Sequence, residues 1–179
     1  MNFSFVPQYA FFEITDISPD YLKGIGVRFL MLDLDNTIAA YGEQTLSADI
    51  SHWAAEMKAD GIELFIISNS TRKGRVESFA KALGVRFIKG ANKPSSKALR
   101  TALTATGFSA NESALVGDQI LTDTLAANRA GVTSIVLRPR SAKNPILAIR
   151  YAMEVPFRVM CKNKMQKGND SRKGLEYEI

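Results

Sequence analysis

The chain has 179 residues, 46% of them hydrophobic and 23% charged, which is enough for one globular domain with a sizeable core. Its net charge of +5 is uneven: residues 1–137 hold 13 basic and 14 acidic residues, whereas residues 138–179 hold 10 and 4. The single cysteine excludes an internal disulfide, and one cysteine with one histidine argues against a zinc site or a Cys–His nucleophile.

The sequence contains no pattern that directs a chain into or across a membrane. No apolar run approaches the roughly 18 residues that span a bilayer. Residues 1–12 are rich in aromatic side chains but lack the basic region of a signal peptide. We therefore expect a cytoplasmic protein that touches a membrane, if at all, only as a peripheral protein.

Strand and helix patterns alternate from residue 27 onward. The expected strands are Val27–Asp33, Ile62–Ile67, Val85–Ile88, Ser113–Val116 and Thr133–Leu137. The expected helices between them are Ser47–Ala59, Thr71–Leu83, Pro94–Thr106 and Leu121–Ala130. This alternation predicts an α/β fold, with a parallel five-stranded sheet covered by helices on both faces.

The C-terminal quarter is expected to differ from the rest. Asn144–Met160 is predicted to form one or two helices, interrupted near Pro156. We expect residues 1–160 to form one domain and residues 161–179 to form a basic, disordered tail. The C-terminal stretch combines apolar and basic residues, which suits an interfacial helix on an anionic membrane. A helix packed on the sheet, followed by a solvated tail, is equally compatible with the pattern.

Polar residues stand where the predicted strands end. Asp33 and Asp35 close the first strand, Ser68 the second and Asp118 the fourth. Parallel strands bring such residues to one edge, where open α/β folds bind ligands. Lys93 precedes a proline, which favours an extended backbone just before a helix, and a helix N-terminus itself attracts phosphate. Lys97, one turn later, competes with Lys93 for the same role.

These residues resemble the four motifs of the haloacid dehalogenase (HAD) phosphatase superfamily. Residues 33–37 look like the first motif, Ser68 the second, Lys93 the third and residues 117–123 the fourth. The motifs occur in the expected order over roughly residues 27–138. The resemblance implies a three-layer α/β/α Rossmann-like HAD fold and a phosphoric monoester hydrolase.

The resemblance also implies catalytic roles. Asp33 would be the nucleophile that forms an aspartyl-phosphate, and Asp35 the general acid and then the general base. Mg²⁺ would be bound by Asp33, Asp118 and the backbone carbonyl of Asp35, and together with Lys93 it would offset the repulsion between two anions.

The resemblance further implies residues that bind the phosphate group and one residue that supports the site from outside the metal's ligands. Asp123 would orient metal-bound water or Lys93 without binding the metal, or it could simply cap the short helix. The residues expected to hold phosphate oxygens are Asn36, Thr37, Ser68, Asn69 and Lys93.

The spacing of the motifs leaves no room for a large cap domain. Only 34 residues lie between Asp33 and Ser68, and 24 between Ser68 and Lys93, and predicted helices and strands fill most of each gap. Residues 38–46 can form only a small flap. We therefore expect an open site that accepts a phosphate on a lipid head group, a nucleic-acid end or a protein.

Within the superfamily, the capless subfamily IIIA group of YqeG type is most similar. The shared features are Val6-Pro7, Lys93-Pro94 and the string from Gly117 to Gly131. Relatives of this group include the mitochondrial phosphatidylglycerophosphate phosphatases. The resemblance therefore implies phosphatidylglycerophosphate as a candidate substrate. Two other hypotheses remain: a polynucleotide end phosphatase, and a non-catalytic module that docks on RNA or a membrane and keeps a vestigial site.

Overall fold

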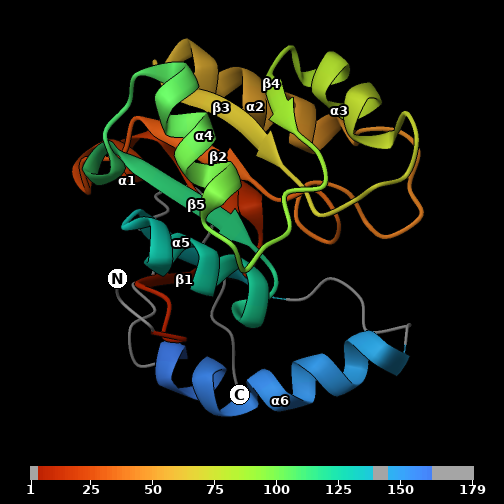
Figure 1. Ribbon diagram of the computed structural model, residues 1–179. Coiled ribbons are helices and arrows are strands. Elements are labelled where there is room, and N and C mark those ends of the chain that lie inside the picture. The colour runs from red at the N-terminus through yellow and green to blue at the C-terminus, as the bar shows by residue number, and fades with distance from the viewer. Residues whose placement is uncertain (1–3, 139–144, 163–179) are drawn as a thin grey trace, which may run out of the picture.

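A parallel six-stranded sheet lies at the centre of the molecule (Figure 1). The structure is a computed structural model, and it describes residues 4–138 and 145–162. The strand order is β1-β6-β5-β2-β3-β4, and every neighbouring pair is parallel. The strands are β1 (Tyr9–Phe11), β2 (Phe29–Leu32), β3 (Glu63–Ile67), β4 (Arg86–Ile88), β5 (Ser113–Gly117) and β6 (Thr133–Leu137).

Helices cover both faces of the sheet and make three layers. One face carries α1 (Pro19–Gly24), α2 (Ala48–Ala59) and α3 (Arg75–Leu83). The other carries α4 (Lys97–Thr106) and α5 (Leu125–Ala130). The last helix, α6 (Pro145–Lys162), lies apart from these layers, beside β1 and α5 (Figure 1). Three short helices complete the fold: the 3₁₀-helices η1 (Ile14–Asp16) and η2 (Ala110–Glu112), and the π-helix η3 (Ile120–Thr124).

The alternation of side chains along β2 explains the two-sided core. Leu30 and Leu32 pack with α2 and α3, whereas Phe29 and Met31 pack with α4 and α5. All four are fully buried, as is usual for the central strand of a parallel sheet. The predicted α/β fold with a parallel sheet is therefore confirmed.

Local sequence signals set several helix ends as predicted. The Ser47 side chain accepts a hydrogen bond from the backbone N–H of Ile50 at the start of α2. Gly84 closes α3 and Gly107 closes α4 with φ of 63° and 80°, a conformation that glycine adopts without strain.

The structure corrects the prediction in several elements. The sheet has six strands and not five, because β1 pairs with β6 at the edge. The helix expected from Thr71 begins at Arg75, and the one expected from Pro94 begins at Lys97. The helix α6 continues through Pro156 without interruption. Pro156 is exposed, so water can satisfy the carbonyl that lacks a partner.

Two further points concern the C-terminal part of the chain. Residues 163–179 of the predicted tail lie outside the described residues, so the division into a domain and a tail stays a prediction. None of the helices within residues 4–138 and 145–162 is long and apolar enough to cross a membrane.

Candidate active site

Three buried carboxylates meet at the carboxyl edge of the sheet. Asp33 follows β2, Asp118 follows β5 and Asp123 lies in η3, and they are 6%, 0% and 3% exposed. Because β2 and β5 are neighbours in register, Leu32 opposite Val116, their ends deliver two carboxylates side by side. One oxygen of each of the three groups lies within 4.8 Å of the others.

A glycine at the end of β5 makes room for the third carboxylate. A Cβ on Gly117 would lie 2.3 Å from Oδ2 of Asp123, closer than real carbon atoms approach. The same Oδ2 accepts a hydrogen bond from the backbone N–H of Gln119 at 3.1 Å. Asp123 thus closes its own turn through Oδ2 and contacts Lys93 through Oδ1.

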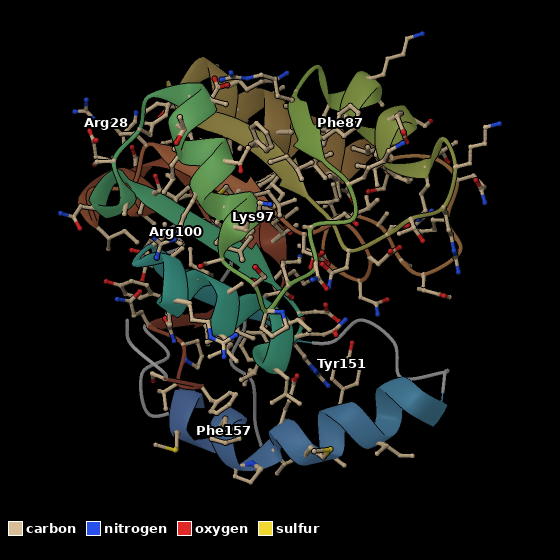
Figure 2. All side chains as sticks on the ribbon, viewed as in Figure 1. Arg28, Phe87, Lys97, Arg100, Tyr151 and Phe157 are labelled. Carbon is tan, nitrogen blue, oxygen red and sulfur yellow. The ribbon has the colours of Figure 1, made fainter. Side chains whose placement is uncertain are left out.

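Lys93 is the cation at the centre of this cluster. Its Nζ lies 2.6 Å from Oδ1 of Asp33 and 2.7 Å from Oδ1 of Asp123, and it donates to the carbonyl of Ile67 at 2.9 Å. The Asp33 carboxylate and the Ile67 carbonyl accept hydrogen bonds from this ammonium group, and the Asp123 carboxylate pairs with it by charge. The competing Lys97 is exposed on α4 (Figure 2).

Asn69 fixes the backbone of Lys93. Its Nδ2 donates to the Lys93 carbonyl at 3.0 Å, and its Oδ1 accepts from the Lys93 N–H at 2.8 Å. The amide was expected to contact phosphate; in this structure both of its polar atoms hold the lysine loop in place.

The cluster holds more negative than positive charge. Burial raises the pKa of Asp33 to about 8, with Asp123 and Asp118 adding to the shift and Lys93 opposing it. Burial alone would lower the pKa of Lys93, but the Asp123 and Asp33 carboxylates outweigh it and raise that pKa, so the lysine stays charged. Three carboxylates against one ammonium leave an excess of two negative charges when all are ionised.

A divalent cation fits this excess. Closely spaced carboxylate oxygens are the ligands that Mg²⁺ prefers, and a charge of two would balance the cluster. The structure brings the predicted ligands Asp33 and Asp118 together, and it adds the Asp123 carboxylate, which we expected only in support. The side chain of Asp35, whose backbone carbonyl was the third predicted ligand, lies outside the three-carboxylate cluster.

Asp35 is instead paired with Arg75, a basic residue after the Ser68 loop for which no contact with Asp35 was predicted. Arg75 donates to Oδ1 of Asp35 from Nη2 at 2.7 Å and from Nε at 3.0 Å. The Asp35 side chain is 24% exposed and the Arg75 side chain 5%. Asp35 therefore has a fixed partner on one oxygen.

A cavity of about 350 Å³ opens beside these groups. Its lining residues are Asp33, Asp35, Asn36, Tyr41, Ser68, Asn69, Ser70, Thr71, Arg72, Lys93, Gln119, Thr122 and Asp123. Thr37, a predicted phosphate contact, is not among them: it is fully buried, and its Oγ1 has no hydrogen-bond partner within the described part of the chain. A wider depression of about 570 Å³ over α4 is lined by no carboxylate.

The helix α6 reaches the site through Tyr151, the second residue that the sequence analysis missed. The Tyr151 hydroxyl donates to Oδ2 of Asp118 and accepts from Nδ2 of Asn36 at 3.4 Å. Figure 2 shows this side chain pointing from α6 toward the body of the protein. On the next turn the buried Glu154 accepts from the Leu121 N–H at 3.1 Å. The site is therefore covered on the Asp118 side, where we expected it to be open.

The parallel sheet, the carboxylates at its edge and the buried lysine define a HAD-like phosphatase. A family model described as HAD-hydrolase-like matches residues 90–143. The chain is 32% identical over 156 residues to "Probable phosphatase YqeG" of Bacillus subtilis (strain 168), with 87% of this chain and 90% of that protein covered. The chain therefore belongs to the YqeG family of HAD-like phosphatases.

Solved structures with the same fold have much lower sequence identity. A protein from Listeria monocytogenes serotype 4b gives a TM-score of 0.54 at 16% identity, covering 74% of this chain and 99% of that one. The 3-deoxy-D-manno-octulosonate 8-phosphate phosphatase from Yersinia pestis gives 0.50 at 18% identity, covering 82% and 88%. At such identities the likeness establishes the fold alone.

Proposed function

We propose that the protein is a Mg²⁺-dependent phosphomonoesterase that forms an aspartyl-phosphate on Asp33. The observation that carries this proposal is the buried cluster of Asp33, Asp118 and Asp123 around Lys93, next to a cavity of about 350 Å³. Asp33 and Asp118, with the backbone carbonyl of Asp35, would bind Mg²⁺. The metal would supply positive charge that lets an anionic nucleophile approach an anionic phosphate.

The reaction has two steps. An oxygen of Asp33 attacks phosphorus, the ester P–O bond breaks, and the leaving oxygen takes its electron pair and a proton from Asp35. Water then attacks the aspartyl-phosphate and gives a proton to Asp35, and the bond to Asp33 breaks to release inorganic phosphate. Lys93 neutralises charge on the nucleophile, and Asn36 and Ser68 in the cavity wall are suited to phosphate oxygens.

The outer side of α6 favours a lipid phosphate as substrate, with phosphatidylglycerophosphate as the candidate. Ile149, Met153 and Met160 are 65%, 62% and 51% exposed, and their spacing places them on one side of the helix. Residues 138–162 contain six basic residues and a single acidic one, Glu154, which is buried. Exposed apolar residues in a basic segment suit contact with an anionic membrane. We infer a peripheral association through the outer side of α6.

A phosphate-release screen with Mg²⁺ tests the substrate class. The substrates are phosphatidylglycerophosphate in vesicles, 3-deoxy-D-manno-octulosonate 8-phosphate, a 5′-phosphorylated oligonucleotide and p-nitrophenyl phosphate. We expect the lipid phosphate to have the highest kcat/KM and Asp33→Asn to abolish every activity. Activity retained by Asp33→Asn would refute the nucleophile, and a strong preference for either soluble biological phosphate would refute the lipid substrate.

Vesicle flotation tests the membrane contact separately. The protein should float with anionic vesicles and not with neutral ones, and the double variant Ile149→Ser, Met153→Ser should stay at the bottom. Phe87→Ser is the matched control, because Phe87 is an exposed apolar residue on β4, at the opposite edge of the sheet from β1 and α6. Equal flotation of all variants would exclude α6 as the contact surface.

A further inference from the structure

A buried arginine connects Asp35 to the flap that follows it, residues 38–46. Arg75, the first residue of α3, is only 7% exposed. Besides its two hydrogen bonds to Asp35, its guanidinium donates to the carbonyl of Ala40 at 3.3 Å and to the carbonyl of Glu43. One side chain therefore fixes both Asp35 and the middle of the flap.

The geometry of this pair leaves one oxygen of Asp35 for the cavity. Both donors of Arg75 end on Oδ1, and Asp35 lines the cavity. A partly exposed carboxylate without such a partner would sample several rotamers. A guanidinium restricts it more than an ammonium would, because its donors form a rigid planar fork.

We propose that Arg75 is a positioning residue, which aims Asp35 at the leaving oxygen and at the same time holds the flap against its own guanidinium. This inference rests on the proposed role of Asp35 as proton donor. When the ester bond breaks, the electron pair stays on the leaving oxygen, and Asp35 must lie within hydrogen-bond reach to protonate it. An alkoxide needs this proton, whereas p-nitrophenolate is a stable anion that leaves without it. A misdirected Asp35 therefore slows alkyl esters selectively.

The test compares glycerol 3-phosphate with p-nitrophenyl phosphate. Arg75→Lys keeps the positive charge but not the fork, and it should lower kcat for the alkyl ester by about tenfold or more while changing the aryl ester less than about threefold. In an Asp35→Asn background it should cause no further loss. Arg86→Lys is the control, because Arg86 is an exposed arginine on β4 that pairs with Glu63 at 3.3 Å.

The outcomes separate this inference from the proposed function. Equal losses on both esters, additive with Asp35→Asn, would make Arg75 merely structural and overturn the inference. If Asp35→Asn itself slows both esters equally, the proton-donor role fails, and the proposed mechanism fails with it.

The link to the flap has its own measurement, which uses a variant that keeps Arg75. Amide hydrogen exchange in residues 40–46 should be faster in Asp35→Asn than in the wild type, because Arg75 loses its anionic partner. Unchanged exchange would remove the flap from the inference, whether or not the Arg75 variants fold.

Discussion

Magnesium affinity should depend steeply on pH, because the metal must displace a proton from Asp33. Burial raises the pKa of Asp33 to about 8 in the metal-free protein. An acid with a raised pKa keeps its proton at neutral pH, and a protonated carboxyl group is a poor metal ligand. The affinity should therefore increase as the pH rises and level off above about 8.

The size of this effect follows from the exchange of one proton. Below the pKa of Asp33 the apparent Kd should fall about tenfold per pH unit, which gives about a 50-fold change between pH of about 6 and about 8. Calorimetric titration with MgCl2 in two buffers of different ionisation enthalpy measures the Kd and the protons released together. Asp33→Asn should flatten the curve. Asp60→Asn should not, because that carboxylate is exposed and paired with Lys23. An affinity that changes less than about threefold, without proton release, would refute the raised pKa.

Three further predictions concern the groups around the cluster. Lys93→Met leaves three buried carboxylates without their cation and should lower the free energy of unfolding, measured by urea denaturation, by about 3–5 kcal/mol. The control Arg86→Met should change it by less than about 0.5 kcal/mol. A loss below about 1 kcal/mol for Lys93→Met would contradict the described pairing. Tyr151→Phe removes the hydroxyl that orients Asp118 and should weaken Mg²⁺ binding by about tenfold with an unchanged circular dichroism spectrum; an unchanged Kd would show that the hydroxyl has no such effect. Gly117→Ala puts a Cβ into the Asp123 carboxylate and should lower kcat by about 100-fold or more, whereas Gly24→Ala meets no atom within 4 Å and should leave kcat unchanged.

The strand-end residues could be predicted because each follows an apolar run of local sequence. Asp33 and Asp118 end buried strands, and parallel strands share their carboxyl edge, so a one-dimensional pattern already brings these groups together. Lys93 could be chosen for a different local reason, since its proline neighbour marks the start of a new segment. The structure reproduces this meeting of groups, while their catalytic roles stay proposals.

The residues that the sequence did not reveal act across long separations. Arg75 and Asp35 are 40 positions apart, and nothing local distinguishes Arg75 from the exposed Arg72 three residues earlier. Tyr151 lies 33 positions from Asp118, on a helix whose packing partner the apolar pattern could not identify. The strand β1 was missed for a similar reason. It has three residues, too few to show alternation, and its neighbour Gln8 bonds to Ser134, 126 positions away.

The loop at residues 107–109, between α4 and η2, divides the proposed machinery into two sets. Asp33 and Lys93 precede it, and Asp118, Asp123 and Tyr151 follow it. Because β2 and β5 lie next to each other at the centre of the sheet, a chain cut at this loop would yield two fragments joined by the β2–β5 and β1–β6 pairings. Neither fragment carries the full set of carboxylates. Phosphate release would therefore return only on reassembly, which makes this fold a candidate for a split reporter of association between two fused proteins.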